Sequence, residues 1–486
     1  MTLGELFGRE GKLPSDLASV PITGLAADSR EVKPGYLFAA LSGVKTDGAR
    51  FIQDALARGA AAILVAEGTA PAASSAAIIE DGDPRRQLAL IAARFYGIQP
   101  KITVAVTGTN GKTSVASFVR QLWAAHGFKA ASLGTVGVVS PRGTEVLKHT
   151  TPDPIELHRI LASLAEDGVT HLALEASSHG LQQRRVDGIT LAAGAFTNIS
   201  RDHLDYHANF EDYFAQKLRL FSELLQRGAG AVVDVDSEAG VRVAGIAEAR
   251  ALNLISVGRS GKTLRLASAT LDGFGQRLEI EHAGRRFLVR LPLVGAFQAS
   301  NALVAAGLAM ATGADAATVL PMLESLKGAR GRLDLAGTAR GGAPIFVDYA
   351  HTPDALAKAL DALRPYVANR LLVVFGCGGD RDKGKRPEMG AVAAAKSDLA
   401  IVTDDNPRSE NPAAIRSQIL AGAPRAIEIG DRAAAIADAV ARLEPGDVLL
   451  VAGKGHETGQ TIGATVIPFS DHDAVAVALQ QEASCG

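Results

Sequence analysis

The apolar stretch at residues 101–108, KITVAVTG, constrains the fold of this chain more than any other feature. It is a continuous, β-branched run, the type of strand that is buried in a parallel sheet. A glycine-containing loop and a long segment with helical periodicity follow it directly. This order of strand, loop and helix predicts a doubly wound α/β domain.

The same order recurs later in the chain. Residues 170–178 (THLALEASS) and 191–200 (LAAGAFTNIS) indicate further strands of this central domain. Between residues 229 and 295, the segments GAVVDVD, RLEIEH and RRFLVRLPL predict an antiparallel annex at one end of the sheet. Functional residues are expected where parallel strands end in polar loops. Four such strands follow at residues 343–350, 370–379, 399–406 and 447–455.

The N-terminal region forms a smaller αβ pattern. Residues 36–41 and 61–67 predict strands, and residues 48–60 between them predict a helix. The apolar face of this helix consists of Phe51, Ile52, Ala55 and Leu56. With the Gly- and Pro-containing boundary YGIQP, we expect three α/β domains, which are residues 1–97, 98–329 and 330–486.

Composition limits the classes of protein that fit. The 486 residues are 47% hydrophobic and 21% charged, which is ordinary for a globular protein of about three domains. The net charge of −2 predicts no general attraction to nucleic acid or to an anionic membrane. Cys377 and Cys485 fit a reducing compartment. No signal peptide or membrane span is recognisable, so we expect a cytoplasmic monomer.

The loop after the first central strand, TGTNGKTS at residues 107–114, predicts a phosphate-binding loop. Its glycines allow backbone N–H groups to approach phosphate oxygens, Lys112 can reach the β- and γ-phosphates, and Thr113 offers a hydroxyl to Mg²⁺. The common pattern would place its first glycine at position 106, where this chain has Val106. The alternative is a glycine turn that merely joins strand to helix.

This loop resembles the ATP loop of the Mur ligase family, which also includes folylpolyglutamate synthetases. Members join an amino acid to a carboxylate with ATP: an acyl phosphate forms first, and an amine then displaces the phosphate. The resemblance covers essentially the whole chain and implies an N-terminal UDP-binding domain, a central P-loop domain and a C-terminal Rossmann-like domain. It implies ATP binding by Gly108, Thr109, Asn110, Gly111, Lys112, Thr113, Ser114, Asn301 and Arg332.

Phosphorylation of a carboxylate brings negative charges together, so cations are needed near the ATP loop. Glu175 ends a buried-type strand, and a lone glutamate or histidine there could also be a hydrogen-bonded loop residue. Lys217 alone indicates a solvated lysine on an amphipathic helix. The resemblance instead implies a Mg²⁺ cofactor held by Thr113, Glu175, His203 and a carbamylated Lys217.

The segment VDYAHTPDAL at residues 347–356 resembles the signature of the third domain in the family. The resemblance implies that Asp348 and His351 act on the nucleotide, whereas the alternative for Asp348 is a helix N-cap or a turn. The catalytic residues implied by the family are Lys112, Lys217, Glu175, His203, Asp348 and His351.

The segment LAADSREVKPGYLFAAL at residues 25–41 resembles the uridine-nucleotide domain of the family. Arg185 would suit a substrate that carries a diphosphate and carboxylates, although it could be a surface charge. The implied contacts with the UDP-linked substrate come from Ala27, Ser29, Val44, Lys45, Thr46, Thr150, Thr151, Ser177, Gln183 and Arg185.

The sequence Asp-Asn-Pro-Arg at residues 405–408 resembles the motif of family members that add meso-diaminopimelate. Arg408 can pair with the distal carboxylate of that amino acid, and Glu457 can pair with an amino group. Lysine has no distal carboxylate and would need no such arginine. A plain Asn-Pro turn is the alternative. The implied binding residues are Arg381, Asp405, Asn406, Pro407, Arg408, Gly453 and Glu457.

These resemblances imply ATP-dependent addition of meso-diaminopimelate to UDP-N-acetylmuramoyl-L-alanyl-D-glutamate. A lysine-adding member of the family is the nearest alternative, and Arg408 argues against it. A folylpolyglutamate ligase would not need residues 1–97. A nucleotide-dependent switch that forms no bond would need fewer charged residues at the strand ends.

Overall fold

The computed structural model describes residues 1–8, 13–43, 47–71, 74–200 and 206–484. The chain forms two compact units. Unit 1 comprises Met1–Arg265 and Leu303–Val319, and unit 2 comprises Leu266–Ala302 and Leu320–Gly486. The domain boundaries after residues 97 and 329 stay predictions. Among the described residues, no helix combines the length and apolarity needed to cross a bilayer.

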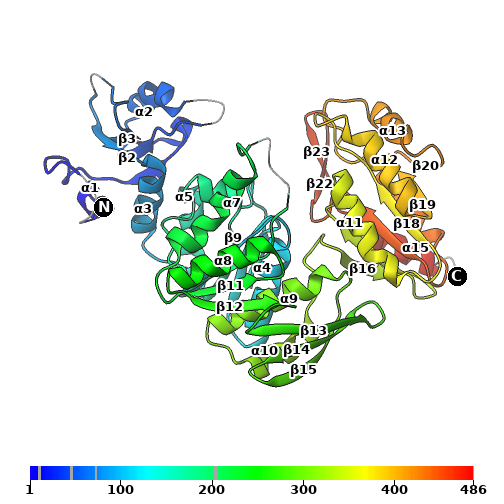
Figure 1. Ribbon diagram of the computed structural model, residues 1–486. Helices are drawn as coiled ribbons and strands as arrows, with labels where there is room; N and C mark the ends of the chain where they lie inside the picture. Colours follow the sequence, from blue (N-terminus) through cyan, green and yellow to red (C-terminus); the bar gives the residue numbers. More distant parts are fainter. Residues whose placement is uncertain (9–12, 44–46, 72–73, 201–205, 485–486) are drawn as a thin grey trace. The chain divides into compact units, whose positions relative to one another are not determined.

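The N-terminal part of unit 1 is a parallel sheet in the order β1-β2-β3-β4, of which Figure 1 labels β2 and β3. The strands expected at residues 36–41 and 61–67 are confirmed as β2 and β3. The expected helix begins as a 3-10 turn, in which side chains repeat every three residues, so Phe51 is 42% exposed and the predicted apolar face is wrong there. The elements are α1 (Leu3–Phe7), β1 (Gly24–Ala26), η1 (Ser29–Glu31), β2 (Tyr36–Ala39), η2 (Gly48–Phe51), α2 (Ile52–Ala57), β3 (Ala62–Ala66), β4 (Ala77–Asp81) and α3 (Pro84–Tyr96).

The central sheet of unit 1 confirms the doubly wound α/β prediction. Its parallel strands run in the order β12-β11-β10-β5-β9-β6, and β7 and β8 extend it antiparallel. The strands are β5 (Ile102–Thr107), β6 (Ala130–Gly134), β7 (Gly137–Ser140), β8 (Gly143–Glu145), β9 (His171–Glu175), β10 (Ala193–Phe196), β11 (Gly230–Asp234) and β12 (Asn253–Gly258). The helices are α4 (Lys112–Ala125), α5 (Pro154–Glu166), α6 (Ser178–Gln182), α7 (Phe210–Arg219), the π-helical turn η3 (Leu220–Leu224) and α8 (Glu238–Ala249).

One expectation for this sheet is wrong. The segment GAVVDVD is not part of an antiparallel annex, because β11 lies between β10 and β12 and is parallel to both. All residues of β11 are buried, as are those of β6, β9 and β10, and a continuous apolar run favours such burial. The annex itself is confirmed in unit 2, where β14 and β15 form an antiparallel hairpin.

Unit 2 contains this annex and the C-terminal sheet. The annex consists of β13 (Leu264–Leu271), which begins in unit 1, β14 (Gln276–His282) and β15 (Arg285–Leu291). The C-terminal sheet has the order β16-β17-β21-β18-β19-β20, parallel except for β16. The four strands predicted after residue 330 are confirmed as β17, β18, β19 and β21. The sheet strands are β16 (Asp334–Thr338), β17 (Pro344–Asp348), β18 (Leu371–Phe375), β19 (Leu399–Val402), β20 (Ile427–Glu428) and β21 (Val448–Ala452).

Helices cover both faces of the C-terminal sheet (Figure 1). One apolar core joins the sheet to α11, α12 and α13, and a second joins it to α14 and α15. A hairpin of β22 (Gly459–Ile462) and β23 (Thr465–Pro468) follows β21. The helices of this part are α11 (Pro353–Leu363), η5 (Arg364–Tyr366), α12 (Lys385–Lys396), α13 (Pro412–Leu420), α14 (Arg432–Ala441) and α15 (Asp471–Ser484). Earlier helices are α9 (Phe297–Ala311), α10 (Ala316–Met322) and η4 (Leu323–Ser325).

Candidate active site

The predicted phosphate loop joins β5 to α4. Gly108 has φ 147°, and a Cβ atom there would lie 1.9 Å from Thr197 Oγ1. Gly111 has φ 86° and precedes the first turn of α4. Both positions therefore require glycine. Val106, the departure from the common pattern, lies inside β5 and is buried, where a strand favours valine.

Two lysines converge on this loop. Lys112 Nζ donates hydrogen bonds to the carbonyl oxygens of Gly108 at 2.9 Å and Thr109 at 2.8 Å. Lys217 Nζ donates to Gly108 O at 2.7 Å and lies 4.4 Å from the centroid of the Tyr213 ring. Because α7 turns this face inward, Lys217 is only 1% exposed. The alternative of a solvated lysine is therefore wrong.

The end of β10 closes the loop from the other side. Asn198 accepts hydrogen bonds from the backbone N–H of Thr109 at its carbonyl oxygen (2.8 Å) and of Asn110 at Oδ1 (3.0 Å). Thr197 Oγ1 donates to Asn110 O at 2.6 Å. Neither Thr197 nor Asn198 was among the predicted site residues. The two polar residues Thr197 and Asn198 at the end of a predicted strand were the sequence signal that could have identified them.

Glu175, at the end of β9, is a buried carboxylate with only 2% exposure. Its Oε1 accepts from the backbone N–H of Thr135 at 2.8 Å, and its Oε2 accepts from Thr135 Oγ1 at 3.2 Å. Within the described part of the chain, no Lys, Arg or His forms an ion pair with it. A buried anion of this kind is costly without a cation, and oxygen donors suit Mg²⁺. Thr113, the other oxygen ligand that the resemblance implies, lies in the first turn of α4.

The remaining metal ligands are placed only in part. The residues that the structure describes contain no group of three or more His, Cys, Asp or Glu side chains able to hold a metal ion. His203 lies outside the described residues. Glu175, Thr113 and Lys217 are described residues, and their assignment as metal ligands stays a prediction.

The residues predicted to hold the UDP-linked substrate partly come together next to Glu175. Thr151 Oγ1 donates to Glu175 O at 2.8 Å and lies 3.1 Å from Ser177 Oγ. Arg185 Nη1 donates to Thr151 O at 2.5 Å, and its Nη2 donates to Gln183 Oε1 at 2.7 Å. Arg185 is thus fixed in this cluster, not a free surface charge.

The other members of that set are more scattered. Thr150 Oγ1 lies 3.1 Å from the Thr135 hydroxyl, next to the same cluster. Ala27 and Ser29 follow β1 of the N-terminal sheet, where Ala27 is exposed and Ser29 is buried. Val44, Lys45 and Thr46 lie outside the described residues.

In unit 2, the Asp-Asn-Pro-Arg segment follows β19 and is fixed on two sides. Arg408 has φ 51°, donates its backbone N–H to Thr461 O at 3.0 Å and accepts from Gly463 N at 2.7 Å. Its Nη1 donates to Gly379 O at 2.7 Å, in the glycine loop after β18. The segment is more than a plain Asn-Pro turn, because the β22–β23 hairpin and the glycine loop both hold Arg408.

Asn406 and Glu457 share a buried lysine. Lys454 Nζ donates to Asn406 Oδ1 at 3.1 Å and to Glu457 Oε2 at 3.0 Å. Asn406 Nδ2 also donates to Glu457 Oε2, at 2.9 Å. Asp405 is buried beside Gly453, where a Cβ atom would lie 2.7 Å from Asp405 Oδ2. The sequence prediction missed Lys454, although it lies in the GKGHE segment.

Asp348 closes β17 and does not cap α11, whose N-cap is Thr352. Its Oδ2 accepts from Leu333 N at 2.7 Å and its Oδ1 accepts from Ala350 N at 2.8 Å. Desolvation raises the pKa of the Asp348 carboxyl, although Arg332 and these two N–H groups lower it. Asp348 is therefore not a helix N-cap. Its two hydrogen bonds with backbone N–H groups fit the alternative of a turn residue.

The other predicted site residues of unit 2 each contact different neighbours. The Arg332 guanidinium lies 5.0 Å from the Tyr349 ring centroid. His351 Nδ1 lies 2.8 Å from Tyr349 O. Asn301, in α9, is buried, and its Nδ2 donates to Gln298 Oε1 at 3.0 Å. Arg381 is exposed, and Pro407 is buried.

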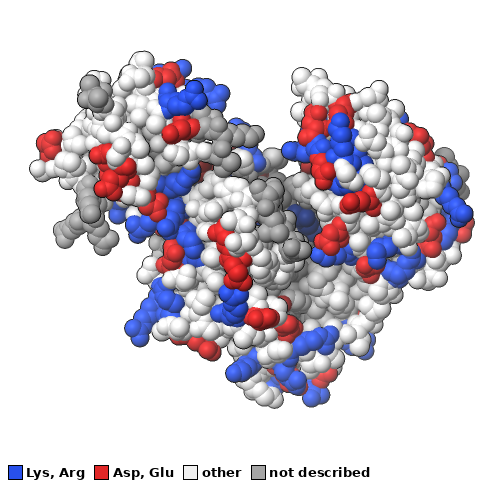
Figure 2. Space-filling view, turned by 45° about the horizontal axis from the view of Figure 1, so that its top comes forward, with Lys and Arg blue, Asp and Glu red and all other residues white. Residues whose placement is uncertain are grey.

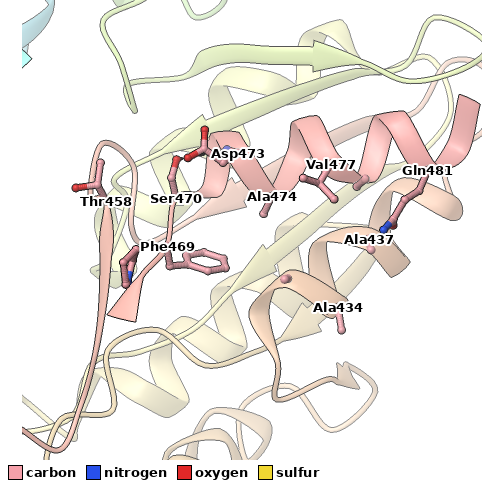
Figure 3. Close-up of a pocket in the computed structure, with 12 residues that line it drawn as sticks. Ala434, Ala437, Thr458, Phe469, Ser470, Asp473, Ala474, Val477 and Gln481 are labelled. Atoms are coloured by element: carbon pink, nitrogen blue, oxygen red, sulfur yellow. Dashed lines mark hydrogen bonds between the residues drawn. The ribbon is translucent and has the colours of Figure 1, made fainter. Parts of the chain in front are cut away.

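A pocket of about 710 Å³ opens elsewhere in unit 2, between α14 and α15. Figure 3 shows the Phe469 ring and the side chains of Ala434, Ala474 and Val477 around it. None of the predicted site residues lines this pocket. Basic and acidic side chains are interspersed on the face drawn in Figure 2, without one dominant sign.

Three segments of the chain match descriptions of one family. Residues 21–96 match "Mur ligase family, catalytic domain", residues 106–309 match "Mur ligase middle domain", and residues 331–455 match "Mur ligase, glutamate ligase domain". The chain belongs to the Mur ligase family. The predicted family and the three-domain α/β fold class are confirmed.

Curated relatives and a solved structure agree with this assignment. The chain is 56% identical over 483 residues to the UDP-N-acetylmuramoyl-L-alanyl-D-glutamate--2,6-diaminopimelate ligase of Bradyrhizobium diazoefficiens, covering 99% of each chain. It is 54% identical to the ligase of the same name from Brucella melitensis, covering 96% of each. A solved structure with that name matches at 32% identity and a TM-score of 0.74, covering 99% of each chain.

A more distant structure supports the fold alone. Mycobacterium tuberculosis folylpolyglutamate synthase complexed with ADP has a TM-score of 0.61 at 18% identity. That match covers 76% of this chain and 92% of the synthase.

Proposed function

We propose that this chain is the ligase that adds meso-diaminopimelate to UDP-N-acetylmuramoyl-L-alanyl-D-glutamate, converting ATP to ADP and phosphate. The observation that carries the proposal is Arg408, which follows β19 in the sequence Asp-Asn-Pro-Arg and is held by a hydrogen bond to Gly379 O. It stands in a chain that is 53–56% identical to six relatives with this printed activity. An arginine held at that position fits an amino acid with a distal carboxylate.

ATP binds with its phosphates at the loop between β5 and α4. Lys112 leaves the carbonyl oxygens of Gly108 and Thr109 and pairs with the β- and γ-phosphates. The N-terminus of α4 and the backbone N–H groups of the loop add favourable dipoles. The resemblance assigns nucleotide contacts also to Thr109, Asn110, Ser114, Asn301 and Arg332, and these assignments remain predictions.

The first chemical step transfers the γ-phosphoryl group to the γ-carboxylate of the D-glutamyl residue. A carboxylate oxygen forms the new P–O bond, and the bond to ADP breaks. Because both reactants are anionic, Lys112 contributes by charge stabilisation and positioning. Mg²⁺ held by Thr113, Glu175, His203 and a carbamylated Lys217 would neutralise phosphate charge. The buried carboxylate of Glu175, which forms no ion pair with another described residue, supports this assignment.

The second step joins the amine of meso-diaminopimelate to the acyl phosphate. The amine nitrogen attacks the acyl carbon, loses a proton and expels phosphate. Arg408 and Arg381 hold a carboxylate, Glu457 holds an amino group, and Asn406 orders the loop. Lysine lacks the distal carboxylate, so Arg408 would have no carboxylate of the substrate to pair with.

The UDP-linked substrate lies at the Thr151–Ser177–Arg185 cluster and at the N-terminal sheet. Arg185 is already oriented by Thr151 and Gln183 and can turn an N–H group to a substrate carboxylate or phosphate. Asp348 and His351 are assigned to the nucleotide by resemblance.

An isotope-transfer experiment tests the reaction. The γ-carboxylate of the D-glutamyl residue is labelled with ¹⁸O, and the products are analysed by mass spectrometry. We expect the UDP-linked tripeptide, with one ¹⁸O atom in the released phosphate. Tripeptide without ¹⁸O in the phosphate would contradict the acyl phosphate, and the absence of any tripeptide would contradict the proposed function. ATP hydrolysis independent of both substrates would favour the nucleotide-dependent switch.

A further inference from the structure

Lys454 is a lysine with no exposed surface, in the loop that follows β21. Long ammonium side chains normally reach water, and a buried one needs compensating acceptors. Lys454 has two side-chain acceptors, Asn406 Oδ1 at 3.1 Å and Glu457 Oε2 at 3.0 Å. Both belong to the candidate diaminopimelate site, and neither the motif nor the family resemblance assigned Lys454 to it.

The three side chains form a closed triangle. Asn406 Nδ2 donates to the same oxygen, Glu457 Oε2, at 2.9 Å. Asn406 Oδ1 accepts a further hydrogen bond from Thr461 N at 2.9 Å. The orientation of the Asn406 amide is thereby fixed, since its oxygen faces two donors and its nitrogen faces an acceptor. Lys454 therefore orders the Asp-Asn-Pro-Arg loop and Glu457 together.

The triangle leaves one carboxylate oxygen of Glu457, Oε1, available to a ligand. Oε2 receives both side-chain donors, and no hydrogen bond from a described residue reaches Oε1. The Glu457 side chain is 32% exposed, whereas Lys454 lies beneath it. A substrate ammonium can then bind Oε1 while Lys454 holds Oε2.

The nearby buried cation does not replace Lys454. Arg432 is paired with Asp471 through two hydrogen bonds of 2.7 and 2.8 Å, and both side chains are fully buried. Its Nη2 also donates to Ala452 O at 2.9 Å. Among the described residues, Lys454 is therefore the cation that forms the ion pair with Glu457.

We propose that Lys454 is a positioning residue for recognition of the incoming amino acid, acting through Glu457 and Asn406. The inference rests on the proposed function. Without the ammonium, Glu457 loses its buried partner and Asn406 loses one of its two donors. Binding of the amino acid then weakens, whereas the phosphate loop in unit 1 keeps all the contacts described above.

Steady-state kinetics of Lys454→Met test this inference. We expect the KM for meso-diaminopimelate to rise about tenfold or more, because a hydrogen bond to a charged group is lost. The KM values for ATP and the UDP-linked dipeptide should stay within about twofold and kcat within about threefold. Lys358→Met is the matched control, because Lys358 pairs with Asp354 on the exposed face of α11. This control should leave all constants unchanged.

Two further variants separate positioning from folding. Lys454→Gln keeps a hydrogen-bond donor and should recover part of the KM, and it carries the test if Lys454→Met does not fold. In the Glu457→Gln background, Lys454→Met should add less than about twofold to the KM. An unchanged KM for meso-diaminopimelate in both Lys454 variants would overturn the inference. Equal losses for all three substrates would overturn it as well. Failure of the wild-type chain to use meso-diaminopimelate would instead overturn the proposed function.

Discussion

Lys112 and Lys217 donate hydrogen bonds to the same acceptor, the carbonyl oxygen of Gly108, at 2.9 and 2.7 Å. The two lysines come from α4 and α7 and are 105 positions apart in sequence. Two ammonium groups at one carbonyl form a strongly positive site for an anion. A phosphate oxygen binding there would pair with Lys112, whereas carbamylation of Lys217 would turn its cationic end into an anion that can hold a metal ion.

Removal of the Lys217 side chain tests its role beside the loop. We expect Lys217→Ala to lower kcat by about 100-fold or more, since charge stabilisation of a phosphoryl group is lost. If Lys217 acts as a carbamate, short carboxylates such as formate should restore part of the rate. Lys112→Ala is the control and should not be rescued. Full activity of Lys217→Ala without any carboxylate would contradict both roles.

Arg408→Ala should remove the preference for an amino acid with two carboxylates. We expect kcat/KM for meso-diaminopimelate to fall about 100-fold, because a charge-assisted hydrogen bond pair is lost. Initial rates with meso-diaminopimelate and L-lysine measure the change. Arg442→Ala is the control, since Arg442 pairs with Asp438 on the surface of α14. A similar loss for both amino acids would indicate that Arg408 only supports the loop.

The glycine at the phosphate loop should tolerate no side chain. Gly108→Ala places a Cβ atom 1.9 Å from Thr197 Oγ1 at φ 147°, so we expect loss of ATP binding, measured by calorimetry. Gly245, in α8, has open space around it. Gly245→Ala should therefore bind ATP normally and stabilise the fold by about 0.5–1 kcal/mol. Tight ATP binding by Gly108→Ala would contradict the geometry of the loop.

His158, in α5, should make the fold sensitive to acid. Burial lowers the pKa of this histidine from 6.5 to about 4. The unfolded chain therefore takes up a proton between these values while the folded chain does not. The stabilisation is present above pH 6.5 and is lost as the pH falls toward 4, by about 3 kcal/mol in total.

Urea unfolding of the wild type and of His158→Leu at pH 7.5 and 4.5 measures this term. Leucine cannot titrate and has no polar atom. In the wild type, His158 Nε2 is buried and has no hydrogen-bond partner among the described residues. The wild type should lose about 2–3 kcal/mol more than the variant on acidification. An equal loss in the two proteins would show that His158 is not the group responsible.

Cys377, directly after β18, should be chemically inert in the native protein. Burial raises the pKa of its thiol to about 12, so little thiolate exists at pH 8. In a Cys485→Ser variant, a thiol reagent should react negligibly with the native protein and with one equivalent after unfolding. Rapid reaction in the native state would contradict the burial of Cys377.

Local patterns predicted most of the fold and the position of the phosphate loop. Continuous apolar runs identified β5, β9 and β10 because strands buried on both faces need no polar residue. The same rule, applied consistently, would have placed β11 in the parallel sheet. The predicted apolar face of the helix at residues 48–60 was wrong only at Phe51. Hydrophobic periodicity cannot show that a 3-10 turn precedes the α-helix.

The missed site features are those that depend on distant partners. The burial of Lys217 depends on Gly108, 109 positions away, and that of Lys454 on Asn406, 48 positions away. A helical pattern cannot distinguish a lysine that faces water from one that faces a carbonyl oxygen. Thr135, which holds both oxygens of Glu175, lies 40 positions from it and was not predicted.

The most direct test of the account is release of phosphate from ATP in the presence of UDP-N-acetylmuramoyl-L-alanyl-D-glutamate, with meso-diaminopimelate or with L-lysine. The account predicts sustained release with meso-diaminopimelate and little with lysine. Equal release with lysine would contradict the role of Arg408. Release with neither amino acid would contradict the proposed function.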